Sequence, residues 1–272
     1  MRNLLPRTLT AIVFIATVLA VIYIAKTFDQ LWILLLLVPI TWWGTMEYVT
    51  LINRLQTVNL EGASLTLLNV IYMSSVVLFH GEYALWTLTF AILWPLIWYS
   101  VNRMKFQNTL ASWFGLLYIP MFFQFNFWVF AAKDGGFFLI FLLASVWVYD
   151  IGAYLVGSFW GREKLIPEVS PKKTWEGVLG GSIGVLLVNT TAPLWIPDLD
   201  WSFRWVLMTL FLVIATQIGD LFESWLKRYV QVKDAGDLLP GHGGILDRID
   251  GLLFAAPVFY FYMRYVLDLI QR

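Results

Sequence analysis

The sequence predicts an all-α integral membrane protein, a polytopic bundle of about nine transmembrane helices. Its composition, its long apolar runs and its uneven distribution of positive charge all favour this fold class. Apolar residues make up 60% of the 272, charged residues only 13%, and the mean hydropathy is +0.73. Soluble domains are about 25% charged. A soluble chain of this length has too much surface for its volume to bury so many apolar side chains, so lipid is the expected solvent.

Apolar runs long enough to cross a bilayer recur along the whole chain. A helix needs about 20 apolar residues to span the hydrocarbon core. The runs are continuous rather than alternating, which argues against a transmembrane barrel. The first follows Arg2 and Arg7 with no small-residue cleavage site after it, so we interpret it as an uncleaved first span. The predicted spans are 8–25, 31–51, 64–79, 83–101, 110–132, 137–157, 177–194, 205–225 and 252–270.

The distribution of lysine and arginine gives an independent test of this topology. With nine spans, 13 of the 18 basic residues fall on the side of the N-terminus and 5 on the other side. The positive-inside rule then predicts a cytoplasmic N-terminus and a C-terminus outside. We expect a single transmembrane domain over 1–272, with helices of 1–135 as scaffold and 136–272 carrying a catalytic site at the cytoplasmic face. The absence of cysteine excludes disulfides and thiolate chemistry.

Acidic residues lie unusually close to the last two predicted spans. Asp220, Glu223 and Lys227 are spaced to share one face of a helix. Asp247 and Asp250 are three residues apart, just before the last span. Ionisable groups at this depth usually face a cavity or a bound ion. Two or three carboxylates that converge without cysteine or histidine favour a hard cation such as Mg²⁺.

A glycine-rich turn and several cations surround these acids. The Pro-Gly-His-Gly-Gly run at 240–244 can direct backbone N–H groups towards phosphate oxygens. Metal ligands, cations and such a turn together are typical of nucleotidyl or phosphoryl transfer. Two simpler interpretations stay open: Lys227 and Arg228 as an ordinary cytoplasmic flank, and His242 as a positional residue. The predicted catalytic cations are Lys227, Arg228, Lys233 and Arg248, and the predicted substrate contacts here are Ser224, His242, Gly243 and Gly244.

A second polar loop, 159–176, carries another candidate substrate site. Asp150 closes the preceding span, and a predicted Ser-Pro turn at Ser170 leads to Lys172 and Lys173 just ahead of a helix. These lysines can hold a triphosphate or a lipid head group, helped by the helix N-terminus. The alternative is simple attraction of anionic lipid. Glu47, in the second span, is a third buried acid, for which a hydrogen-bonded structural role and a catalytic one both stay open.

The run from 224 to 250 resembles the signature of the phosphatidate cytidylyltransferase (CDP-diacylglycerol synthase) family. Every fixed position of that signature is present, and the segment 170–177 also looks like a family motif. The resemblance covers roughly the C-terminal half, while the N-terminal half is similar only in hydropathy. The matching positions are Ser224, Lys227, Arg228, Lys233, Asp234, Gly236, Pro240, His242, Gly243, Gly244, Asp247, Arg248 and Asp250.

The resemblance implies a multi-pass enzyme of the cell (inner) membrane that joins CTP to phosphatidic acid and releases pyrophosphate. It also implies dependence on Mg²⁺, with a metal site that maps to Asp220 and Asp247 and with Asp250 as a further ligand. K⁺ as a second cation and a homodimer are implied as well. Its partners are then CTP, phosphatidic acid and membrane lipid, and we expect no nucleic acid. Two alternatives remain. One is a related CTP-using lipid enzyme, such as a prenol kinase. The other is a cation transporter lined by Glu47, Asp150 and Asp220, although no internal repeat is visible.

Overall fold

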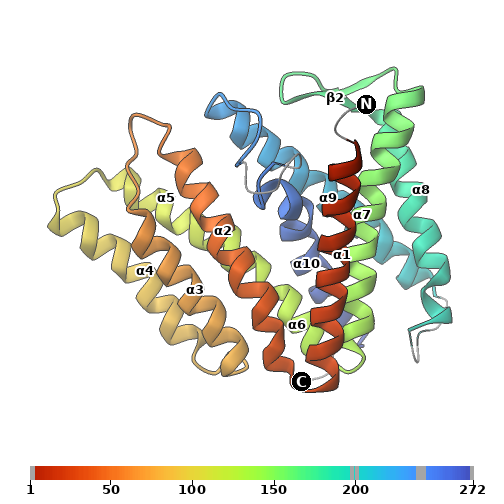
Figure 1. Cartoon of the computed structure of the whole chain (residues 1–272), viewed down its shortest axis with the longest axis horizontal. Coiled ribbons are helices and arrows are strands. Elements are labelled where there is room, and N and C mark those ends of the chain that lie inside the picture. The colour runs from red at the N-terminus through yellow and green to blue at the C-terminus, as the bar shows by residue number, and fades with distance from the viewer. Residues whose placement is uncertain (1–3, 197–198, 200–201, 237–242, 270–272) are drawn as a thin grey trace. The chain divides into compact units, whose positions relative to one another are not determined.

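Helices dominate the computed structural model, which describes residues 4–196, 199, 202–236 and 243–269 (Figure 1). Each predicted span coincides with a helical segment. The apolar segment Phe106–Ala131 combines α5, a π-helical stretch and α6. The helices are α1 (Leu4–Thr27), α2 (Leu34–Ile52), α3 (Gly62–Leu78), α4 (Ala84–Val101), α5 (Phe106–Leu116), α6 (Phe125–Ala131), α7 (Gly135–Trp160), α8 (Trp175–Thr191), α9 (Phe203–Tyr229) and α10 (Leu246–Tyr265).

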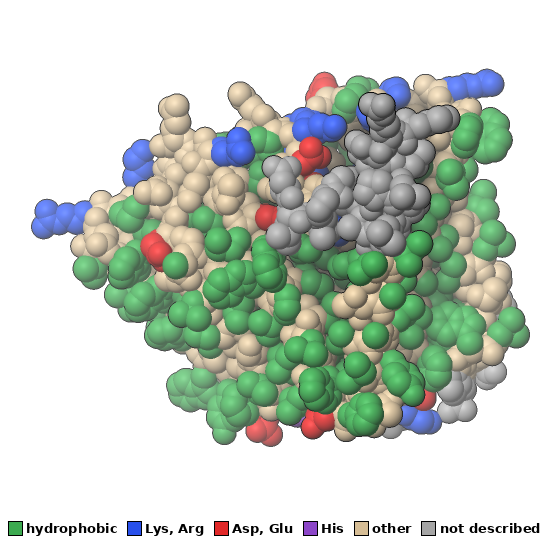
Figure 2. Space-filling view, in the orientation of Figure 1, with side chains coloured by type: hydrophobic (Ala, Val, Ile, Leu, Met, Phe, Trp, Pro, Cys, Tyr) green, Lys and Arg blue, Asp and Glu red, His purple; other side chains and the backbone are tan. Residues whose placement is uncertain are grey.

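The apolar surface of these helices fits a multi-pass membrane protein. Figure 2 shows hydrophobic side chains over much of the visible surface. Within the described residues, six helical segments are long and apolar enough to cross a bilayer, and two further apolar helices are shorter. The six are Gln30–Ile52, Ala84–Val101, Phe106–Ala131, Gly135–Trp160, Trp175–Leu194 and Phe203–Tyr229; the shorter two are Ile12–Thr27 and Gly62–Leu78.

The chain folds into two compact units that each combine segments distant in sequence. The first unit comprises Met1–Phe127 and Tyr229–Arg248. The second comprises Trp128–Arg228 and Ile249–Arg272. The segment with the glycine-rich turn therefore clusters with the N-terminal helices.

The first unit is held together by polar groups buried between apolar helices. The Tyr48 hydroxyl on α2 donates to the Ala111 carbonyl on α5 over 2.7 Å. A Cβ at Gly115 would lie 2.6 Å from the Tyr48 ring, so only glycine lets the two helices approach this closely. On α3, the Tyr72 hydroxyl donates to the Gln124 side chain over 2.9 Å. These bonds satisfy polar groups that would be costly to bury unpaired.

In the second unit, glycines allow α7 and α8 to pack backbone against backbone. A Cβ at Gly152 of α7 would lie 2.9 Å from the Gly180 carbonyl oxygen of α8. Small residues at such contacts are the usual means by which membrane helices approach closely. The Tyr149 hydroxyl on α7 also donates to the Gln217 side chain on α9 over 2.6 Å. Helices α7, α8 and α9 thus form one packed group.

A short β-hairpin connects α7 and α8 within the predicted all-α architecture. Strand β1 (Lys164–Ile166) pairs antiparallel with β2 (Ser170–Thr174). The predicted Ser-Pro turn is wrong, because Ser170 lies opposite Ile166 in the ladder. The hairpin leads directly into α8, whose N-cap Thr174 accepts a hydrogen bond from the Gly177 N–H over 3.2 Å. Such a cap satisfies one of the N–H groups that a helix leaves open at its start.

Candidate functional site

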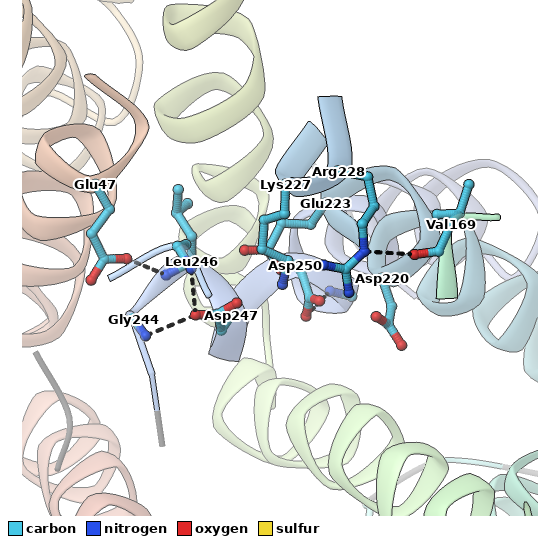
Figure 3. Close-up of polar contacts among 12 residues, drawn as sticks. Glu47, Val169, Asp220, Glu223, Lys227, Arg228, Gly244, Leu246, Asp247 and Asp250 are labelled. Atoms are coloured by element: carbon cyan, nitrogen blue, oxygen red, sulfur yellow. Dashed lines mark hydrogen bonds and ion pairs between the residues drawn. The ribbon is translucent and has the colours of Figure 1, made fainter. Parts of the chain in front are cut away.

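The C-terminal end of α9 carries a buried ion pair. The helix continues to Tyr229, beyond the predicted limit at residue 225, so Lys227 is helical. The predicted shared face is confirmed here: the Glu223 carboxylate, with no exposed surface, lies 3.3 Å from the Lys227 ammonium one turn later (Figure 3). A buried pair of this kind is stable only while both partners are present.

The hairpin contacts the same end of α9 through two polar interactions. Lys173 on β2 forms an ion pair with Asp220. Arg228 donates its Nε hydrogen to the carbonyl oxygen of Val169 over 3.2 Å, as Figure 3 shows. One residue predicted to bind substrate and one predicted to bind metal therefore contact each other directly. Arg228 positions the hairpin in addition to any role as a cation.

Asp250, on α10, lies close to the charged face of α9. Its carboxyl group forms a hydrogen bond with the Glu223 side chain and interacts electrostatically with Asp220 and Lys227. The approach depends on Gly219, because a Cβ there would lie 2.3 Å from the Asp250 carbonyl oxygen. The second unit thus brings three carboxylates of 220–250 into one neighbourhood, together with a lysine that offsets part of their negative charge.

In the first unit, Asp247 organises the start of α10. Its Oδ2 atom accepts hydrogen bonds from the Gly244 N–H over 2.8 Å and the Ala235 N–H over 3.0 Å. Gly243 has a φ of +80°, a conformation that L side chains rarely adopt. The Asp247 carboxylate therefore connects a residue that precedes 237–242 with one that follows them.

Glu47 approaches the same loop from α2. Its Oε1 accepts the Ile245 N–H and its Oε2 accepts the Leu246 N–H, both over 2.9 Å (Figure 3). The structure thus confirms that this buried acid is hydrogen-bonded. Sequence reasoning identified the acid but not its partners, because they lie 198 and 199 residues away in the chain.

The other predicted site residues are distributed over both units. Ser224 is buried in α9, Asp150 lies exposed on α7, and Lys172 is exposed on β2. Lys233 and Arg248 are exposed in the first unit. His242 lies outside the described residues. Side-chain cations thus flank the acids in each unit.

The acids offer the chemistry that a hard cation requires. Among the residues that the structure describes, no three Asp, Glu or His side chains are grouped closely enough to hold a metal ion. Asp220 and Asp250 are nonetheless near enough for their charges to interact, and the Lys173 ammonium already lies against Asp220 as a metal cation would. Carboxylate oxygens of this kind suit Mg²⁺. The second unit thus contains two of the three predicted metal ligands, Asp220 and Asp250, and the binding of Mg²⁺ stays a prediction.

Comparisons with known proteins point to one family. The model of the cytidylyltransferase family matches residues 5–266. The chain is 46% identical over 125 residues to the phosphatidate cytidylyltransferase of Bacillus subtilis (strain 168) and 48% identical over 129 residues to that of Brucella suis biovar 1 (strain 1330); each alignment covers 46% of either chain. It is 42% identical over 161 residues to the phosphatidate cytidylyltransferase of Thermotoga maritima, covering 57% of this chain and 59% of the relative. The matched segments thus span about half the length of these relatives.

Proposed function

Because the chain belongs to the cytidylyltransferase family, we propose that it transfers the cytidylyl group of CTP to phosphatidic acid, yielding CDP-diacylglycerol and pyrophosphate. The observation that carries this proposal is the alternation of carboxylates and lysines at the end of α9, where Lys173 pairs with Asp220 and Lys227 with Glu223. Acids can hold a metal and lysines can neutralise phosphates, and nucleotidyl transfer requires both. Named relatives with this activity support the choice of substrates.

In the proposed reaction, a phosphate oxygen of phosphatidic acid attacks the α-phosphorus of CTP. A new P–O bond forms, the bond from the α-phosphorus to the bridging oxygen breaks, and pyrophosphate leaves with that oxygen. A phosphate monoester has a second pKa near ~6, so the nucleophile is already largely anionic at neutral pH. The protein therefore needs to supply position and positive charge rather than a general base, and a central role for His242 is not required.

Each charged group has a distinct proposed task. We retain Asp220, Asp247 and Asp250 as ligands of Mg²⁺, which when bound would offset the negative charge of the two phosphates, with K⁺ as a second cation. Ser170, Asp150, Ser224, Gly243 and Gly244 stay proposed substrate contacts, although the N–H group of Gly244 itself donates to Asp247. The side chains proposed to neutralise the triphosphate and the lipid head group are Lys172, Lys173, Lys227, Arg228, Lys233 and Arg248.

The membrane setting follows from the same charges. We propose nine spans with a cytoplasmic N-terminus and an external C-terminus, in the cell (inner) membrane, because 13 of the 18 basic residues then face the cytoplasm. CTP is available on that side. Two acyl chains can remain in the bilayer while the head group reacts at the membrane face. A homodimer remains part of the proposal.

The test uses purified protein in detergent with phosphatidic acid, Mg²⁺ and CTP labelled in either the α- or the γ-phosphate. Cytidylyl transfer moves the α-label into the lipid phase and releases the γ-label as pyrophosphate. A prenol kinase would instead transfer the γ-label to an added prenol and release CDP. If neither label enters any lipid in folded protein supplied with K⁺, the enzyme proposal is refuted and transport becomes the next hypothesis. An Asp220→Asn variant serves as the matched negative control.

A further inference from the structure

Glu47 is a buried acid outside the proposed reaction chemistry, and its contacts define a specific task. We propose that Glu47 is a positioning residue, which fixes the first turn of α10 and thereby aims Asp247. The proposal deepens the proposed function and rests on it, since Asp247 is there a metal ligand. It assigns an essential contact of the site to α2, in the N-terminal half of the chain.

The Glu47 carboxylate is costly to bury without partners. Glu47 is 8% exposed within an apolar helix, where a charged group without partners would be strongly unfavourable. Two consecutive backbone N–H groups, those of Ile245 and Leu246, each donate to a different oxygen of its carboxylate. Hydrogen bonds to an ionised acceptor are stronger than neutral ones. Glu47 and the start of α10 therefore stabilise each other.

The N–H groups that bind Glu47 lie at the start of α10. Leu246 is the first residue of α10, and the first N–H groups of a helix lack acceptors within it. Negative charge at this end also interacts favourably with the helix dipole. Asp247, the next residue, accepts the N–H groups of Gly244 and Ala235. The two acids together bind four backbone N–H groups of one loop, so moving Glu47 would move the frame that holds Asp247.

Two glycines, Gly236 and Gly244, pack closely against the Glu47 carboxylate. A Cβ at Gly236 would lie 2.7 Å from Glu47 Oε1, and a Cβ at Gly244 would lie 2.4 Å from Oε2. Distances this short do not occur between real Cβ atoms and oxygens. Both glycines thus lie against the Glu47 carboxylate, and a larger residue at either position would displace it.

Hydrogen–deuterium exchange of the segment 243–250 tests the contact directly. Glu47→Gln keeps the shape but presents an NH₂ group to one of the two N–H donors, so we expect exchange in this segment to become roughly tenfold faster. Glu61→Gln is the matched control, because Glu61 also accepts an N–H at a helix start in the same unit, that of Ser64 at the start of α3, over 2.7 Å. The control should leave exchange at 243–250 unchanged.

Turnover per folded protein gives the functional measurement. Loss of a group that orients a metal ligand typically costs roughly tenfold to a hundredfold in activity, so kcat of Glu47→Gln should fall by this factor while Glu61→Gln stays near the parent. Unchanged exchange at 243–250, or turnover within about twofold of the control, would overturn the proposal. Should Glu47→Gln fail to fold, Gly236→Ala disturbs the same contact from the loop side and must give the same result. A parent protein that makes no CDP-lipid refutes the proposed function, and the exchange experiment then decides the contact alone.

Discussion

Removal of the Lys227 ammonium is expected to destabilise the protein strongly. At an N···O distance of 3.3 Å and an effective dielectric constant of about 20, the attraction to Glu223 is about 5 kcal/mol before desolvation. Lys227→Met would leave a carboxylate with no exposed surface without this partner. Breaking a buried pair from one side typically costs about 3–5 kcal/mol. The nearby negative charges of Asp220 and Asp250 act in the same direction.

Thermal unfolding in detergent measures this loss through the fluorescence of the 15 tryptophans. A cost of this size lowers the melting temperature by roughly 10 °C in a chain of this length. The double variant Glu223→Gln with Lys227→Met removes both charges and should recover most of the loss. Lys105→Met, at an exposed lysine before α5, should change the melting temperature little. The reasoning is refuted if Lys227→Met unfolds within about 2 °C of the parent, or if the double variant is no more stable than the single one.

Three further outcomes are expected. Asp247→Asn should reduce α-label transfer from CTP by at least roughly a hundredfold, since the ligand charge is lost, while gel filtration shows folded protein; near-normal transfer would contradict the metal assignment. Arg228→Gln removes the hydrogen bond to Val169, so trypsin should cleave after Lys172 several times faster, and an unchanged rate would contradict its positioning role. Gly152→Leu inserts a side chain where a Cβ would lie 2.9 Å from a carbonyl oxygen of α8. The free energy of unfolding should therefore fall by about 1–3 kcal/mol, and thermal unfolding should begin at a lower temperature.

The sequence predicted the helical segments well because hydropathy and helix length are local properties. Even the unusual segment 110–132 was identified as one apolar run, although Pro120 lies in a π-helical stretch inside it. The limits of helices were less accurate. Helix α9 continues through Lys227 and Arg228, and α10 begins at Leu246 rather than at residue 252. Polar residues can continue a helix beyond the membrane, so a hydropathy limit is only a minimum.

The parts that could not be predicted depend on contacts between distant segments. Strand β2 contains Pro171 and two lysines, and neither strand has an alternating apolar pattern, so periodicity could not identify β1 and β2. The ion pair of Lys173 with Asp220 joins two polar motifs that the sequence indicated separately. A single sequence gives no signal for such a pairing, because the presence of each residue can be explained by the motif in which it lies.

The glycine-rich turn shows how a local interpretation changes once distant partners are known. Its glycines were predicted to direct N–H groups towards phosphate. Where the structure describes this turn and the residues after it, the Gly244 N–H donates to Asp247, and the N–H groups of Ile245 and Leu246 donate to Glu47. Because an N–H that already donates to a carboxylate is poorly placed to bind a second anion, we expect these three groups to contribute little to phosphate binding. In the proposed reaction, neutralisation of the triphosphate would then depend on the lysines and arginines that accompany both polar segments of the proposed site.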